Sequence, residues 1–160
     1  MKNKRQDGFS LIELLIVVAI IGIIAAIAIP NLMASRRAAN EGSAQSSVRT
    51  IHSAQVTYQA TGGAGGYAPD LATLRTQRLI DTVLGGGQKS GYDFVIVEQG
   101  GLNAAAVYGV YGFPSVTTGV SQSGTRRFAT THVGIMHGDT NLTVLPDTIA
   151  LIDNLPVLGN

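Results

Sequence analysis

The feature that most constrains this chain is an apolar run over residues 9–29, in which only Ser10 and Glu13 are strongly polar. As a helix rising about 1.5 Å per residue, the run is roughly 32 Å long, close to the thickness of a bilayer's hydrocarbon core. The run therefore predicts a helix that spans a membrane.

The residues before the run are basic and include Lys2, Lys4 and Arg5. The positive-inside rule then places the N-terminus in the cytoplasm and the rest of the chain outside. A cleaved secretory signal is the main alternative, with residues 14–25 as its apolar region and residues 26–28 ("AIA") as the cleavage site. A buried core helix fits the length and the basic flank less well.

Glu13 is the one ionisable residue inside the run. A carboxylate within a membrane span costs about 2.5–3.5 kcal/mol on insertion scales and usually has a specific partner. The sequence therefore raises the question of what Glu13 pairs with.

The segment "GFSLIELLIVVAIIGIIAAIAIP", residues 8–30, resembles the N-terminus of type IV pilins and of the pseudopilins of type II secretion. The resemblance implies that a prepilin peptidase cuts between Gly8 and Phe9 and that the new N-terminal Phe9 is N-methylated. An ordinary signal peptide needs neither this Gly-Phe pair nor Glu13, so the long motif favours prepilin processing.

Cleavage after Gly8 would create a positive amine on Phe9, about one helical turn from Glu13. The carboxylate can pair with the amine of its own chain in the membrane, or with that of a neighbouring subunit in a filament. The family resemblance implies the second role, in subunit assembly. A tolerated glutamate at the membrane interface is the alternative.

Gly22 and Pro30 are the weak points of this helix, because glycine and proline cost about 1 and 3 kcal/mol in a helix interior. They predict a bend or kink in one subunit, and the resemblance implies that this stretch can extend within a filament. A plain helix stop at Pro30 is the alternative.

After Pro30 the pattern becomes that of an amphipathic helix that ends at "TGGAGG", residues 61–66. Small and apolar residues recur three and four apart, so one stripe is expected to pack on a globular head. The stripe comprises Ala44, Val48, Ile51, Ala54 or Gln55, and Tyr58.

The remaining residues predict a glycine-rich head with a short helix and an antiparallel sheet of three or four strands. Its expected parts are a helix in 69–80 with Asp70 near its start, a loop at 85–91, strands at 92–98 and 103–114, and a hairpin in 126–139 with Phe128, Val133 and Ile135 as its apolar positions. The fold class is α+β, with a long N-terminal helix packed on a small sheet. The expected domains are a leader (1–8), an assembly helix (9–30), an amphipathic second half (31–61) and the head (62–160).

The C-terminal residues 140–160 are apolar but contain Pro146 and Pro156. They are expected to pack on the sheet, add an edge strand or contact a neighbour. Four residues in or beside this segment carry carboxylate or amide oxygens of the kind that bind calcium, but their spacing matches no calcium-binding loop. We therefore predict that they form turns and hold no metal. These residues are Asp139, Asn141, Asp147 and Asp153.

No enzymatic pattern stands out. The three histidines, His52, His132 and His137, suggest no complete metal site, and "GGGQKSG" lacks the phosphate-loop spacing. The chain has no cysteine, and its net charge of +1 with no basic cluster argues against nucleic-acid binding. We predict a non-enzymatic protein without a cofactor.

The predicted function is that of a structural subunit of a type IV pilus-like filament. Its expected partners are further copies of itself, a prepilin peptidase and methyltransferase, an inner-membrane assembly machinery, and the bilayer before assembly. The precursor is expected in a bacterial inner membrane and the product in an extracellular pilus or a periplasmic pseudopilus. There are two alternatives to this function. The chain could be a type II secretion pseudopilin, or it could be a membrane-tethered or secreted binding domain.

Overall fold

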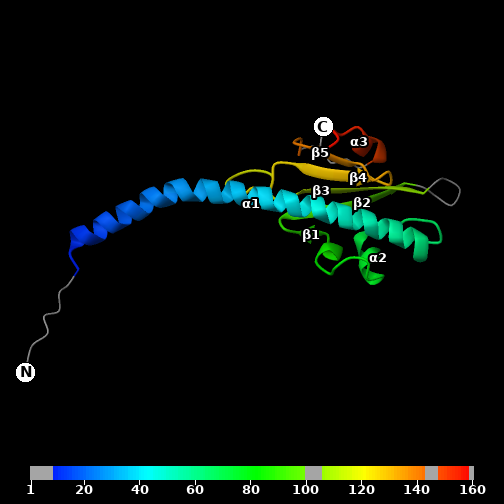
Figure 1. Ribbon diagram of the computed structural model, residues 1–160, viewed down its shortest axis with the longest axis horizontal. Coiled ribbons are helices and arrows are strands. Elements are labelled where there is room, and N and C mark those ends of the chain that lie inside the picture. Colours follow the sequence, from blue (N-terminus) through cyan, green and yellow to red (C-terminus); the bar gives the residue numbers. More distant parts are fainter. Residues whose placement is uncertain (1–8, 100–105, 143–147, 159–160) are drawn as a thin grey trace, which may run out of the picture. The chain divides into compact units, whose positions relative to one another are not determined.

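The computed structural model describes residues 9–99, 106–142 and 148–158 and confirms the α+β class (Figure 1). The chain divides into two compact units, Met1–Ser35 and Arg36–Asn160, which are described separately below. Its helices are α1 (Leu11–Thr61), α2 (Leu71–Thr76) and α3 (Ile149–Asp153), with a 3₁₀ turn η1 (Leu84–Gly86). The strands are β1 (Gln88–Lys89), β2 (Tyr92–Gln99), β3 (Val107–Pro114), β4 (Arg127–Thr131) and β5 (Met136–Asp139).

Helix α1 ends where the glycine-rich segment begins, as predicted. The amides of Gly62 and Gly63 both donate to the carbonyl of Tyr58, at 2.9 and 2.8 Å. Pro30 lies inside the helix, which continues through it, so the plain helix stop is wrong. Just after Pro30, the side-chain amide of Asn31 donates to the carbonyl of Ile27 at 3.1 Å.

In the first unit, the apolar side chains of α1 are exposed on every side. The exposed fraction is 81% for Leu11, 58% for Ile21 and 66% for Ile27. The helix is long and apolar enough to cross a membrane, and no residue of its most apolar window is buried. This surface therefore needs lipid or other protein to cover it.

In the second unit, the five strands form an antiparallel sheet in the order β1-β2-β3-β4-β5. The segment 85–91, expected as a loop, instead contains the end of η1 and the short strand β1. Ser90 and Gly91 join β1 to β2 with φ values of 51° and 74°. Two consecutive positive φ values are typical of a type I′ turn, which matches the twist of a two-residue hairpin.

One face of the sheet packs on α1 and forms the main core. The predicted stripe is buried, with both Ala54 and Gln55 on it, except for Tyr58, which is partly buried and packs against the core. Asp70 caps α2 by accepting a hydrogen bond from the amide of Thr73 at 2.7 Å, as its position suggested. The core members are Ala44, Val48, Ile51, Ala54, Ala68, Leu71, Leu74, Ile80, Leu84, Tyr92, Phe94, Tyr108, Val110 and Phe128.

Gln55 joins α1 to the segment that follows it. Its side chain is fully buried and forms two hydrogen bonds of 2.8 Å with the backbone of Ala68, one to the carbonyl and one from the amide. Both polar atoms of the Gln55 amide are therefore satisfied inside the core.

The opposite face of the sheet is covered by α3, which the sequence did not predict. Ile152 of α3 packs on Tyr111 and Ala129 in a second, smaller core. Beyond α3, Val157 forms a bridge with His137 of β5, so the C-terminal segment both packs on the sheet and covers its edge. Strand β3 is consequently buried on both faces, which explains its nearly continuous apolar sequence.

The hairpin in 126–139 is confirmed as β4 and β5. Of the three apolar positions named for this hairpin, Val133 and Ile135 lie in the connecting turn and are 60% and 46% exposed. Phe128, in contrast, is fully buried.

Candidate functional site: the N-terminal segment

Glu13 closes the first turn of α1 in this structure. Its carboxylate accepts a hydrogen bond of 2.9 Å from the backbone amide of Ser10, which directly precedes the helix. Ser-x-x-Glu at a helix start is the capping-box pattern, in which the glutamate satisfies an otherwise unpaired amide. The negative charge also suits the positive end of the helix dipole.

The sequence interpretation overlooked Ser10 as the partner of Glu13. The signal was present in "SLIE", since serine three residues before glutamate at the start of an apolar helix is a recognised pattern. Glu13 therefore has a local structural role in addition to any role in pairing with an amine.

Phe9 is 89% exposed and next to this cap. Gly8 lies outside the described residues, so the geometry of the Gly8–Phe9 bond is not part of the structure. Cleavage at that bond and methylation of Phe9 stay predictions, as does the pairing of Glu13 with the Phe9 amine of another subunit.

Gly22 lies in open surroundings: apart from its chain neighbours and the adjacent helix backbone, no atom lies within 4 Å of the position that a Cβ would occupy. Nothing in the first unit therefore requires glycine there for packing. The proposed flexibility of the stretch from Gly22 to Pro30 remains a prediction.

In the second unit, the loop of residues 115–125 is attached to the start of its helical part. The side-chain amide of Asn40 donates to the carbonyl of Ser123 at 2.9 Å. The carboxylate of Glu41 accepts from the amide and the hydroxyl of Thr125, at 2.8 and 2.7 Å. These contacts join residues more than 80 positions apart, so no local sequence pattern indicates them.

The histidines make separate contacts with the protein. His52 Nδ1 lies 2.5 Å from the hydroxyl of Tyr108, and burial lowers the pKa of His52. His137 Nδ1 lies 2.7 Å from the carbonyl of Leu155, whereas His132 Nδ1 is buried without a hydrogen-bond partner. Among the described residues, no three histidine or carboxylate side chains form a group that could hold a metal ion.

The two described carboxylates among the residues considered for calcium, Asp139 and Asp153, are engaged within the protein. Asp139 pairs with Arg127 at 2.7 Å, and Asp153 accepts a hydrogen bond from the hydroxyl of Thr131 at 3.0 Å. The backbone amide of Asn141 donates to Asp139 at 3.1 Å. Asp147 lies outside the described residues.

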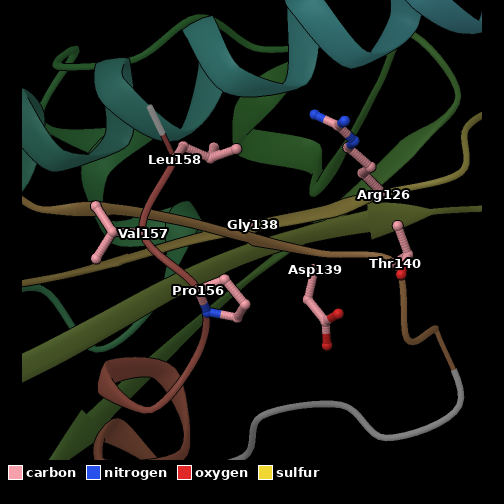
Figure 2. Close-up of a pocket in the computed structure, with 7 residues that line it drawn as sticks. All are labelled: Arg126, Gly138, Asp139, Thr140, Pro156, Val157 and Leu158. Atoms are coloured by element: carbon pink, nitrogen blue, oxygen red, sulfur yellow. The ribbon is translucent and has the colours of Figure 1, made fainter. Parts of the chain in front are cut away.

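A hollow of about 340 Å³ lies between β5 and the C-terminal segment, and Figure 2 shows the residues that line it. Its lining contains one carboxylate, from Asp139, which is already paired with Arg127. No paired nucleophile and base line it, so the hollow has no recognisable catalytic arrangement. It is lined by Arg126, Gly138, Asp139, Thr140, Pro156, Val157 and Leu158.

Comparison with known proteins finds similarity in the N-terminal segment. Residues 3–29 match the family described as the prokaryotic N-terminal methylation motif. The chain is 46% identical over 56 residues to the type IV major pilin protein PilA of Myxococcus xanthus, covering 35% of this chain and 26% of that protein. It is 61% identical over 41 residues to the type IV wide pilus major component PilA4 of Thermus thermophilus, covering 26% of this chain and 30% of that protein.

A third relative is the type II secretion system core protein G of Aeromonas hydrophila. It is 36% identical over 59 residues, covering 37% of this chain and 41% of that protein. The similarity to these three relatives thus spans between 26% and 41% of their lengths, and no solved structure is significantly similar to the chain. The chain therefore carries an N-terminal methylation motif, and its N-terminal third resembles type IV pilins and the core pseudopilin of type II secretion.

Proposed function

We propose that this chain is the precursor of a type IV pilus-like filament subunit that polymerises through its N-terminal helix. The main support for the proposal is that the methylation motif lies on a helix whose apolar surface is exposed on every side. Lipid covers this surface in the precursor, and the helices of other copies cover it in the filament. The relatives named for pilus components point in the same direction.

Processing is proposed between Gly8 and Phe9 by a prepilin peptidase, with methylation of the new Phe9 amine. Residues 1–8 then act as leader, 9–30 as assembly helix, 31–61 as amphipathic helix and 62–160 as head. The N-terminus begins in the cytoplasm, and an inner-membrane machinery extracts the subunit into the filament.

In the filament, Glu13 is proposed to pair with the Phe9 amine of a neighbouring subunit. Opposite charges about 4 Å apart attract by roughly 4 kcal/mol at an effective dielectric constant of 20, and water is excluded between packed apolar helices. Such a pair would set the axial position at which each subunit joins. Glu13 can give up its capping hydrogen bond with the Ser10 amide and pair with the Phe9 amine instead. Both groups lie at the N-terminal end of a helix.

The test separates the charge of Glu13 from its capping bond. Glu13→Gln keeps an oxygen that can cap Ser10 but removes the charge, whereas Glu13→Ala removes both. We expect both variants to enter the membrane and be processed, and both to lose filaments. Filament yields from Glu13→Gln equal to those of the unmodified protein would refute the pairing and leave only the capping role.

The stretch from Gly22 to Pro30 is proposed to extend when the filament is stretched. Gly22 makes no packing contact that requires glycine, and Pro30 removes one hydrogen bond of the helix. This region would therefore lose its helical hydrogen bonds first.

A periplasmic pseudopilus is the second candidate, because several relatives are type II secretion core protein G. The location of the product distinguishes the two. Filaments recovered by shearing intact cells support a pilus, whereas subunits retained within the cell envelope support a pseudopilus.

A further inference from the structure

A hydrogen bond between His52 and Tyr108 joins α1 to the middle strand of the sheet. His52 lies in the part of α1 that belongs to the second unit, and its Nδ1 atom is 2.5 Å from the hydroxyl oxygen of Tyr108 on β3. Tyr108 is fully buried, and its ring packs on that of Tyr67 with 4.5 Å between the ring centroids. Among the described residues, His52 is the only hydrogen-bond partner of this buried hydroxyl.

The turn of residues 132–135, between β4 and β5, lies close to the same histidine. A Cβ at Gly134 would be 3.1 Å from Nε2 of His52, so the turn approaches the second nitrogen of the ring. The backbone amide of His132 donates to the carbonyl of Tyr108 at 2.9 Å, which joins the turn to β3. His52 therefore lies where α1, β3 and this turn meet.

The surroundings assign the protons of the hydrogen bond at neutral pH. Burial raises the pKa of Tyr108, so the phenol keeps its proton, and a buried hydroxyl needs an acceptor for it. Nδ1 of His52 is the acceptor that the described residues offer, so the neutral ring carries its own proton on Nε2. The contact in this form requires an uncharged His52.

Protonation of His52 reverses this arrangement. Nδ1 becomes a donor, the Tyr108 hydroxyl can then only accept from it, and the hydroxyl hydrogen is left without a partner in the core. The positive ring is also partly withdrawn from water, and this burial lowers the pKa of His52. Both effects destabilise the contact between α1 and β3 in acid.

The charged groups around His52 do little to stabilise a positive ring. Neither ion pair in the part of the chain that the structure describes involves His52. The nearest charge along α1 is that of Arg49, which has the same sign. On β2, Glu98 is the register partner of Tyr108, and its side chain lies outside the described part. The other titratable groups on the neighbouring elements are the phenols of Tyr67 and Tyr108 and the imidazole of His132.

We propose that the hydrogen bond between His52 and Tyr108 makes the packing of α1 on the sheet pH-sensitive: the contact holds at neutral pH and loosens in mild acid, when His52 takes up a proton. Histidine is the side chain whose charge ordinarily changes in this range. The proposal does not depend on the filament function, because it concerns the head alone. It gives the head a response to acid that residues 1–35, which contain no histidine, lack.

Chemical unfolding of the full chain in detergent, followed by near-ultraviolet circular dichroism, tests this contact. Because the pKa of His52 is lowered in the folded state, its stabilising effect is present above about pH 6.5 and is lost as the pH falls below that value. The unfolding equilibrium constant should therefore rise by up to about tenfold per pH unit between about pH 6.5 and pH 5, the limit for one proton. Failure of the constant to rise would overturn the proposal.

Three variants assign the effect to His52. His52→Asn offers an oxygen near the position of Nδ1 that can accept from Tyr108 but does not titrate, so its unfolding constant should rise less in acid. The matched control His132→Asn removes a histidine from the neighbouring turn and should respond to pH as the unmodified protein does. Glu98→Gln removes the carboxylate opposite Tyr108 and should not reduce the response. An equal response of His52→Asn and the unmodified protein would overturn the proposal.

Nitrogen-15 NMR of the unmodified protein gives a measurement that needs no variant to fold. At about pH 7.5 we expect His52 to show the neutral ring with its proton on Nε2, and to become protonated with a midpoint below about 6.5. A neutral ring with its proton on Nδ1, or a midpoint at or above about 6.5, would overturn the proposal.

Discussion

The hydrogen-bonded contact of Gln55 with Ala68 provides a quantitative test of how the head is held to α1. Replacing Gln55 by Met keeps the length of the side chain but removes both 2.8 Å hydrogen bonds. The amide and carbonyl of Ala68 are then left without partners, and an unsatisfied buried group costs about 1–3 kcal/mol. Allowing for partial access of water, we expect Gln55→Met to lower the free energy of unfolding by about 3 kcal/mol.

Thermal unfolding followed by near-ultraviolet circular dichroism measures this loss in the full chain in detergent. The chain has no tryptophan, and all five tyrosines belong to the unit of residues 36–160, so the signal reports on the head. A loss of about 3 kcal/mol should lower the Tm by roughly 10 °C in a domain of this size.

The matched control is Gln59→Met, one turn further along the same helix. Gln59 is half-buried and makes a single longer hydrogen bond, 3.3 Å to the carbonyl of Gly65. Its replacement should cost less than about 0.5 kcal/mol. Equal losses for the two variants, or a loss below about 1 kcal/mol for Gln55→Met, would refute the reasoning.

Three further predictions follow from single contacts. Gly112→Ala would place a Cβ 2.7 Å from Cε1 of Phe94, so we expect a loss of about 1–3 kcal/mol in denaturant unfolding, and an unchanged midpoint would contradict this packing. Burial acts to raise the pKa of Asp139, but hydrogen bonds to the carboxylate, including one from Arg127, outweigh it and hold the pKa below its ordinary value. The resulting stability is present above about pH 4 and lost as the pH falls through the lowered pKa, so the advantage of the unmodified protein over Asp139→Asn should shrink as the pH falls below about 4. Pro30→Ala should stiffen the filament in force–extension measurements, because it restores a helical hydrogen bond, and unchanged stiffness would contradict the proposed flexibility.

The parts of the fold that local sequence patterns control could be predicted. The apolar run, the glycine-rich helix end and the Asp70 cap each depend on residues within a few positions of one another. The three-four spacing of small residues also identified the face of α1 that packs on the sheet.

The parts that depend on distant contacts could not be predicted in the same way. Helix α3 is only five residues long and is stabilised by packing on β3 and β4, which no local pattern reveals. Val133 and Ile135 look like strand residues, but the turn between β4 and β5 takes them out of the sheet. The attachment of Thr125 to Glu41 joins residues 84 positions apart.

The candidate site was only partly predictable for a different reason. The motif predicts roles for Phe9 and Glu13, whereas the contact of Glu13 with the backbone amide of Ser10 follows from a different pattern, Ser-x-x-Glu at a helix start. The amine proposed to replace it exists only after cleavage and, in a filament, belongs to another copy.

The mass and the N-terminal residue of the mature protein, isolated from native membranes or sheared fibres, test the central claim most directly. Our account predicts a chain that begins with N-methylated Phe9. A chain that begins at Ile29 would have lost Glu13 and the helix start that Glu13 caps, and would contradict assembly through this segment. An intact chain that begins at Met1 would contradict processing and leave a static membrane anchor.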